Sequence, residues 1–126
     1  MLIDSNIIIY ASQPEHARLR EFIAAKVPAV SAVSYVEVLG YHELTATEES
    51  LFREFFTVST VLPIDQDVLD KAVTLRQQRR MTLGDALVAA TALVHRLPLV
   101  THNVDDFAWI DDLTLVDPLD PTWPSS

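Results

Sequence analysis

Residues 82–107 read TLGDALVAATALVHRLPLVTHNVDDF, and this stretch decides the fold class. Thr82 precedes a run rich in Ala and Leu, which predicts a helix over residues 83–95. Residues 98–101 then form a short apolar segment that is typical of a buried strand. The polar sequence that follows indicates a helical turn over residues 103–110. A helix that leads into a short apolar strand is the repeating unit of an α/β fold.

The same alternation extends over the whole chain. Further strands are predicted at residues 1–3, 27–31, 58–64 and 113–116. Further helices are predicted to begin at Pro14, after Ser34 as a cap, at Thr47 and after Asp65 as a cap. Residues 117–126 contain three prolines and are predicted to be extended or loose. Short strands that alternate with amphipathic helices predict an α/β sandwich around a mostly parallel sheet of four to five strands.

The composition excludes several classes of protein. The 126 residues are 49% apolar, enough for one compact domain with a real core. The longest apolar stretch, residues 86–94, is less than half of the roughly twenty residues that a membrane span needs. The absence of cysteine excludes a disulfide scaffold and a thiolate zinc site, and fits a reducing, cytoplasmic compartment. With only two glycines, the chain has no glycine-rich phosphate loop.

The charge of the protein is strongly and unevenly negative. The net charge is −9, and residues 97–126 contribute six acidic side chains and no basic one. Bulk attraction therefore cannot bring this protein to a nucleic acid. Binding of phosphate groups would require a local reversal of charge, for which a divalent cation is the obvious candidate.

Five acidic residues lie where predicted elements meet. Asp4 directly follows the first strand, Glu37 lies in the helix after the second strand, and Asp85 lies in the first turn of the helix before the fourth. Asp105 and Asp106 come soon after the end of that fourth strand. Because ligands of open parallel sheets bind outside the carboxyl ends of the strands, these acids are candidates for one site. A site made only of oxygen ligands would select Mg²⁺ or Mn²⁺ over zinc.

Each of these acids also has a purely structural interpretation. Asp85 follows Thr82 by three residues, as in a variant of the helix capping box, and Asp4 can cap the turn after the first strand. Asp105 and Asp106 can be a solvated pair. Glu37 is harder to explain in this way, because its apolar neighbours would make an unpaired carboxylate costly to bury. The joint position of the acids at strand ends favours a common site.

The basic residues cluster in one place. Arg76, Arg79 and Arg80 are three of the nine Lys and Arg residues, and their spacing places them on one helical face. They can form a solvated surface, or they can contact phosphate groups beside the acidic site. Trp109 and Trp123 are interpreted as packing residues rather than as platforms for stacked bases.

Four segments, taken in order, carry a family resemblance. They are Leu2-Ile-Asp4-Ser-Asn6, Ser34-Tyr-Val-Glu37-Val-Leu, Gly84-Asp85-Ala-Leu-Val-Ala-Ala-Thr-Ala92 and Leu99-Val-Thr101-His-Asn103-Val-Asp-Asp106-Phe107. This ordered set resembles the PIN-domain family, and within it the VapC-type toxin ribonucleases of bacterial toxin–antitoxin systems. The resemblance implies a PIN-like three-layer sandwich over residues 1–118, followed by a Pro-rich tail at residues 119–126.

The resemblance also implies roles for individual residues. The four acidic positions of the family, which are catalytic and hold the metal, match Asp4, Glu37, Asp85 and Asp106. Its supporting polar positions match Ser5, Asn6, Thr101 and Asn103. Asp105 falls where the family is variable. Many relatives carry a Lys where this chain has Thr82, so a cationic contact with RNA phosphates is either missing here or comes from Arg79 or Arg80 of the arginine cluster.

The function that the resemblance implies is that of an endoribonuclease dependent on Mg²⁺ or Mn²⁺. Its implied partners are an RNA substrate, a VapB-like antitoxin and a second copy of the chain. Transfer, ribosomal and messenger RNA all remain open as substrates. One alternative is a catalytically silent PIN-like module that binds proteins. A receiver-like phosphoacceptor is disfavoured, because no acid adjoins Asp4 and no Lys follows Lys71.

Overall fold

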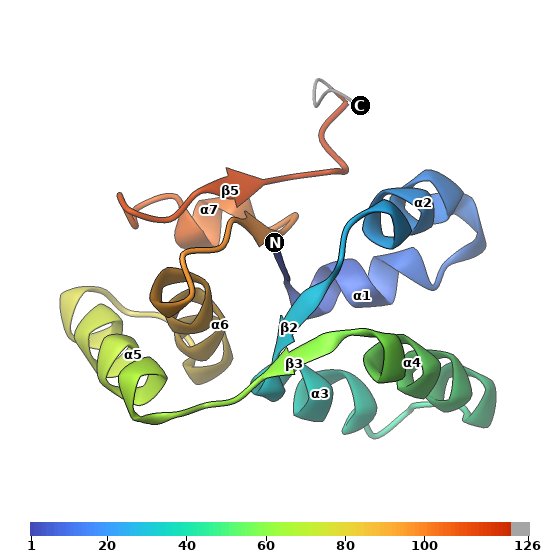
Figure 1. The fold of residues 1–126 in the computed structure, drawn as a ribbon, viewed down its shortest axis with the longest axis horizontal. Coiled ribbons are helices and arrows are strands. Elements are labelled where there is room, and N and C mark those ends of the chain that lie inside the picture. Colours follow the sequence, from blue (N-terminus) through green and yellow to red (C-terminus); the bar gives the residue numbers. More distant parts are fainter. Residues whose placement is uncertain (122–126) are drawn as a thin grey trace.

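The computed structural model describes residues 1–121, and in this part of the chain a five-stranded sheet lies between two layers of helices (Figure 1). The strand order is β3-β2-β1-β4-β5, and every neighbouring pair is parallel. The strands are β1 (Leu2–Ile3), β2 (Ala29–Ser31), β3 (Thr60–Leu62), β4 (Leu99–Val100) and β5 (Leu115–Val116). The predicted parallel α/β sandwich is therefore confirmed.

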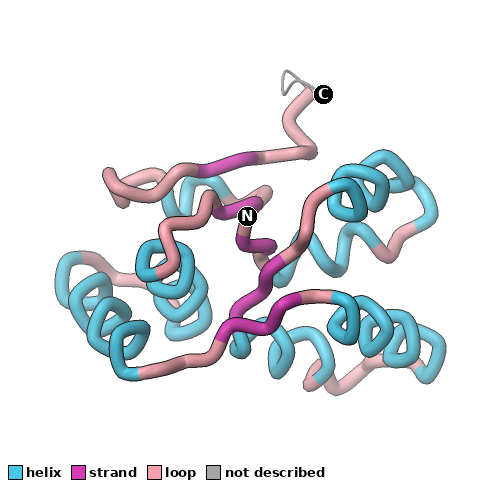
Figure 2. The backbone as a smooth tube through the Cα atoms, viewed as in Figure 1, coloured by secondary structure: helices cyan, strands magenta, loops and turns pink. Residues whose placement is uncertain are grey.

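The strands are very short, and the helices make up most of the described chain (Figure 2). The helices are α1 (Ser5–Ala11), the 3₁₀ helix η1 (Pro14–His16), α2 (Ala17–Ala25), α3 (Ala32–Leu39), α4 (Ala46–Val58), α5 (Gln66–Gln78), α6 (Leu83–Val94) and α7 (Val104–Phe107). Such short strands cannot form a stable sheet by their own pairing, so helix packing on both faces has to stabilise them.

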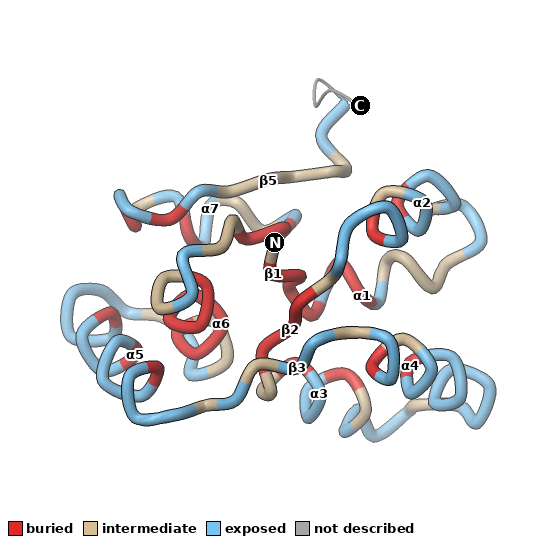
Figure 3. The backbone as a smooth tube through the Cα atoms, viewed as in Figure 1, coloured by how far each residue is buried: buried red, intermediate tan, exposed pale blue. Residues whose placement is uncertain are grey.

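Alternation along the strands divides the core in two. In β1, Leu2 packs into the cluster formed with α5, α6 and α7, whereas Ile3 packs into the cluster formed with α1 to α4. Leu99 and Val100 of β4 divide in the same way. Figure 3 shows α6 buried along most of its length, because Ala-rich residues 86–92 allow it to lie close to the sheet and to α5. The two clusters hold the carboxyl edge of the sheet in place.

Several predicted elements are shorter in the structure, such as the helical turn predicted over residues 103–110, which is confined to α7. Three further predicted boundaries were wrong for reasons that the contacts explain. The cap of α3 is Ser31, whose Oγ accepts a hydrogen bond from the Val33 N–H, and Ser34 lies inside the helix. The helix predicted from Thr47 begins earlier, because Thr45 and Glu48 form a complete capping box. The strand predicted at residues 58–64 is confined to β3, since Val58 still belongs to α4. The caps at Ser31 and Thr45 set the starts of α3 and α4, and the continuation of α4 to Val58 sets the start of β3.

The end of the described chain forms a turn rather than an extended segment. The N–H of Asp120 donates to the carbonyl oxygen of Asp117 at 3.2 Å, so the prediction of a loose segment fails for residues 117–121. The remainder of the predicted tail, including Trp123, lies outside the described residues. Within residues 1–121, no helix has both the length and the apolarity needed to cross a membrane.

Candidate acidic active site

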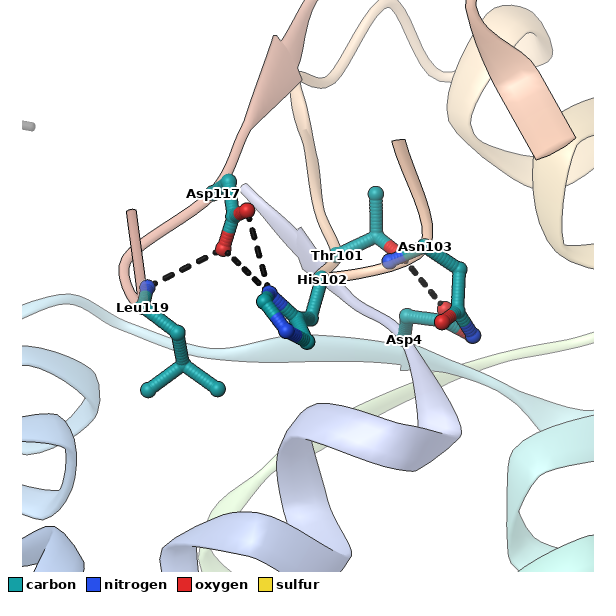
Figure 4. A network of polar contacts seen from close by, with 6 residues as sticks. All are labelled: Asp4, Thr101, His102, Asn103, Asp117 and Leu119. Carbon is teal, nitrogen blue, oxygen red and sulfur yellow. Dashed lines mark hydrogen bonds and ion pairs between the residues drawn. The ribbon is translucent and has the colours of Figure 1, made fainter. Parts of the chain in front are cut away.

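Asp4 lies at the end of the central strand, and both of its carboxylate oxygens are occupied. Its N–H donates to the Val100 carbonyl oxygen at 2.9 Å, which extends the pairing of β1 with β4. Oδ1 accepts from the Ser5 N–H at 2.8 Å and thereby caps α1. Oδ2 accepts from the Thr101 hydroxyl, also at 2.8 Å (Figure 4). Only 4% of the residue is exposed. Asp4 therefore has its predicted capping role and also lies at the carboxyl ends of the parallel strands.

The environment of Asp4 resists ionisation. Burial raises the pKa of the Asp4 carboxyl to about 6, against an ordinary value of 3.8. The hydrogen bonds from Thr101 and Ser5 lower this pKa, and the negative charges of Asp85 and Glu37 raise it. These charges act on Asp4 because the fold brings three distant acids to one edge of the sheet.

The side chain of Glu37 extends from α3 to the first turn of α6. The Ser5 hydroxyl lies 2.8 Å from both Glu37 Oε1 and Ser34 Oγ, so it donates its one proton to the carboxylate and accepts from Ser34. A methyl group added at Gly84 would lie 2.5 Å from Glu37 Oε2. Glu37 itself is solvent-exposed, so its carboxylate is not the buried, costly charge that its apolar neighbours suggested. It lies against the first turn of α6 only because residue 84 has no side chain.

Asp85 serves the helix and the acidic cluster together. Its N–H donates to the Thr82 hydroxyl at 3.1 Å, which is the predicted capping contact. Its side chain is half-buried, and this burial raises the pKa of the Asp85 carboxyl. The charges of Asp106 and Glu37 raise the same pKa further, while a hydrogen bond from Thr82 lowers it. Asp85 therefore links Asp106 to the group formed by Glu37 and Asp4.

The two neighbouring acids of α7 differ in their relation to Asp85. Asp105 and Asp106 are both exposed, and both line a cavity of about 580 Å³ that also contains Asp85. Of these two acids, Asp106 carries the charge that raises the pKa of Asp85. Phe107 is fully buried and anchors the turn. The structure thus brings Asp4, Glu37, Asp85 and Asp106 together, with Asp105 at the margin.

The arginine cluster borders this acidic group. Arg76, Arg79 and Arg80 line the same cavity as Asp85 and Asp106. Arg76 donates through Nε to the Met81 carbonyl oxygen at 3.3 Å, which holds the loop between α5 and α6. Within residues 1–121, none of these three arginines forms an ion pair. The cavity therefore has one basic and one acidic wall.

The four residues predicted to support the acids, Ser5, Asn6, Thr101 and Asn103, differ in the contacts of their side chains. Ser5 and Thr101 contact the acids directly, as described above. Asn103 contributes its backbone N–H, which donates to the Thr101 hydroxyl at 3.0 Å. Asn6 is exposed, and no side-chain hydrogen bond connects either asparagine to another residue in the part of the chain described. Sequence reasoning missed the role of Ser34, although it lies in the same segment as Glu37.

A second group of polar contacts lies next to Thr101 and involves the segment that follows β5. The Nδ1 atom of His102 lies 3.1 Å from both carboxylate oxygens of Asp117, and the Leu119 N–H donates to Asp117 at 3.0 Å (Figure 4). The ring of Tyr10 meets His102 edge-on at 5.9 Å. These contacts hold the segment after β5 against the loop that contains Thr101.

The chemistry of the acidic cluster fits a divalent cation. All of its donors are oxygens, which Mg²⁺ and Mn²⁺ prefer. Burial, together with the negative charges of neighbouring acids, raises the pKa of Asp4 and Asp85, and a positive ion would favour the ionised form of both. As positioned within residues 1–121, no three His, Asp or Glu side chains converge closely enough to enclose an ion. Binding would therefore require rotation of the more exposed carboxylates towards Asp4.

The protein belongs to a class of α/β proteins in which carboxylate side chains gather where the parallel strands end. Comparison with known families identifies this class. The PIN domain model matches residues 1–113, so the chain belongs to the PIN domain family. No curated protein sequence matches the chain.

Solved structures agree with this assignment. A chain of a toxin–antitoxin complex from Klebsiella pneumoniae is 30% identical, with a TM-score of 0.75 over 93% of this chain and 96% of that one. DNA-bound VapBC from Salmonella typhimurium contains a chain with a TM-score of 0.81 at 18% identity, over 92% and 96% of the two chains. VapBC-1 from nontypeable Haemophilus influenzae gives 0.75 at 24% identity, over the same shares. The latter two likenesses establish the fold.

The raised pKa of Asp4 predicts a specific dependence of stability on pH. Because the folded pKa lies above the unfolded one, the contribution of the Asp4 carboxyl to stability falls as pH rises from about 4 to about 6. Asp4→Asn removes this effect, and at pH 7 it should raise the free energy of unfolding by about 1–3 kcal/mol, less whatever the lost hydrogen bonds contributed. Urea unfolding of both proteins between pH 4 and pH 8 measures the difference. Asp111→Asn, at an exposed acid, is the control, and a constant difference across the range would contradict the assignment.

The contact between Glu37 and Gly84 predicts a coupling between positions 5 and 84. Ser5→Ala should destabilise the wild-type protein by about 1 kcal/mol, through loss of the hydrogen bond to Glu37. In a Gly84→Ala background the added methyl displaces Glu37, so the same change should cost much less. Gly84→Ala alone should not unfold the protein, because Ala favours the helix. Equal costs of Ser5→Ala in both backgrounds would show that Glu37 accommodates the methyl in place.

Proposed function

We propose that this protein is the toxin of a VapBC-type toxin–antitoxin module, and that it acts as a metal-dependent endoribonuclease in the cytoplasm. The observation that carries the proposal is the buried Asp4 carboxylate, whose pKa is raised to about 6 beside other acids at the sheet edge. Membership of the PIN domain family supports a nuclease, and likeness to a chain of the Klebsiella pneumoniae toxin–antitoxin complex supports the toxin role.

In this proposal the four acids have different tasks. Asp4, Asp85 and Asp106 would hold Mg²⁺ or Mn²⁺, with the Ser5 N–H and the Thr101 hydroxyl fixing the direction of the Asp4 carboxylate. When bound, such an ion supplies a water of lowered pKa and stabilises the negative charge that develops on the phosphate group. The chain itself provides the rigid edge on which these carboxylates are arranged.

Glu37 is proposed to orient the attacking water and accept its proton. Ser5 occupies Oε1 of Glu37, which leaves Oε2, lying over Gly84, as the proton acceptor. Water then adds to phosphorus and gives its proton to Glu37, while the bond to the ribose 3′-oxygen breaks and this oxygen takes a proton from solvent. Because the nucleophile is water rather than the ribose 2′-hydroxyl, the products carry a 5′-phosphate and a 3′-hydroxyl.

Two protein partners follow from the proposed role. A VapB-like antitoxin with an arginine-bearing segment would complement the acidic edge.

An apolar groove of about 610 Å³ between α1, α2 and α4 offers a separate surface, with Leu51, Val27 and Val58 exposed along it. Apolar surface of this kind is typical of an interface with another protein. A homodimer is proposed from the family resemblance alone.

The two neighbouring acids of α7 provide a matched test of the nuclease activity. Asp106→Ala should reduce Mn²⁺-dependent cleavage of single-stranded RNA by at least about a hundredfold, as expected for loss of a group that stabilises the transition state. Asp105→Ala removes the same charge one residue earlier and should change the rate by less than about threefold. Sequencing the 5′-phosphate ends formed in cells after induction identifies the RNA. Equal losses would show that the wrong acid is assigned, and no cleavage by the wild type would favour the silent protein-binding module.

The unpaired arginines predict how an acidic protein binds RNA. The double substitution of Arg79 and Arg80 by Ala should weaken RNA binding in Ca²⁺ by about tenfold, since each arginine contributes a charge-assisted contact to phosphate. Because few phosphates are contacted, log affinity should fall with log salt concentration with a slope on the order of −1 to −3. The double substitution of Arg18 and Lys71, two exposed cations on α2 and α5, is the charge-matched control. Equal effects of the two double variants would assign the cluster to nonspecific surface charge.

A further inference from the structure

Trp109 occupies a fixed position on the rim of the cavity between the acids and the arginines. Its indole Nε1 donates to the carbonyl oxygen of Asp106 at 3.1 Å, so the ring is tied to the same turn of chain as the acidic group. The ring packs partly against the core cluster beneath α7, and it is only half-buried. A flat aromatic surface is therefore held at a constant place beside the carboxylates.

The outer face of this ring is covered by a cation that has no acidic partner. The guanidinium carbon of Arg79 lies 5.7 Å from the centroid of the indole, within the range of a cation–π contact. Asp105 and Asp106 line the same cavity, yet among residues 1–121 Arg79 forms no ion pair with either. Arg79 is exposed at the end of α5 on a long, flexible side chain, so it can leave the ring without breaking a salt bridge.

We propose that Trp109 and Arg79 form a stacking site for one nucleobase of the bound RNA, next to the phosphodiester that is cleaved. The proposal rests on the nuclease function argued above. Single-stranded RNA is bound largely through stacking of its unpaired bases on aromatic rings and on guanidinium planes. An incoming base would take the place of the guanidinium on the indole, and Arg79 would then cover the outer face of the base.

This arrangement explains how affinity can arise in a protein of net charge −9. Stacking does not depend on the sign of the protein's overall charge, whereas attraction of the RNA backbone does. The interpretation of Trp109 as a packing residue alone is therefore incomplete, since one side of the ring packs against the core and the other is covered by the flexible side chain of Arg79. Stacking accepts every base, but its strength grows with the π surface of the base, so a modest purine preference is expected at one position beside the cut.

Cleavage of a pool of 12-nucleotide single-stranded RNAs of random sequence tests the proposal. With Mn²⁺, wild type and Trp109→Phe should show the same base preference at one position flanking the cut. Trp109→Leu, which keeps an apolar side chain but loses the ring, should flatten that preference and lower kcat/KM about tenfold, a typical loss for one stacked base. A merely structural role of Trp109 would lower cleavage of all sequences equally and leave the preference unchanged, and this result would overturn the proposal.

A binding measurement separates failure of this inference from failure of the nuclease proposal. In a Trp123→Phe background, Trp109 is the only tryptophan, so its fluorescence reports on this ring alone. In Ca²⁺, the random 12-mer should quench the emission strongly, while an abasic 12-mer with the same sugar–phosphate backbone should not. Equal quenching by both would exclude stacking even if cleavage is normal. Quenching by the 12-mer alone, without any cleavage in Mn²⁺, would support the stacking site and contradict the nuclease function.

Discussion

The burial of one carboxylate at the end of the central strand is the constraint around which the acidic site is organised. Asp4 caps α1 and continues the pairing of β1 with β4. It also accepts a hydrogen bond from the hydroxyl of Thr101, which lies 97 residues away in the chain. These contacts fix the position of the carboxylate. Its hydrogen bonds do not fully offset the cost of burying its negative charge, because burial still raises its pKa to about 6. Two hydrogen bonds stabilise the negative charge, and the other carboxylates at the edge oppose it.

The opposing charges come from elements whose positions follow from the parallel topology. The strand order places β2 and β4 on either side of β1, so the segments that leave their carboxyl ends meet around Asp4. Gly84 allows the first turn of α6 to approach Glu37, and the charge of Asp106 reaches Asp85 from α7. A fold optimised only for stability would separate these charges. Their retention in one place is typical of sites where perturbed pKa values serve chemistry.

Much of this arrangement could be predicted from the sequence, because it depends on patterns of short range. Apolar runs ending at Ile3 and Val100 predicted buried strands, and the polar residues after them predicted the edge of the sheet. Cap positions were less predictable, since Ser31 and Ser34 are the same residue type three positions apart. Only the contact of Ser5 with Ser34 and Glu37, which joins α1 to α3, distinguishes a cap from a residue of the site.

The residues that sequence reasoning could not place are those whose role depends on a neighbour distant in the chain. Gly84 appeared in the family motif, but its proximity to Glu37 has no signature in local sequence. Trp109 was interpreted as a packing residue, and its Nε1 contact is local, yet the guanidinium that covers its outer face comes from the end of α5. Because the cation meets the ring rather than an acid, the cavity keeps both its positive charge and its carboxylates available. In the proposed function, this separation of charges within the cavity, rather than the net charge of the protein, would allow contact with a polyanion.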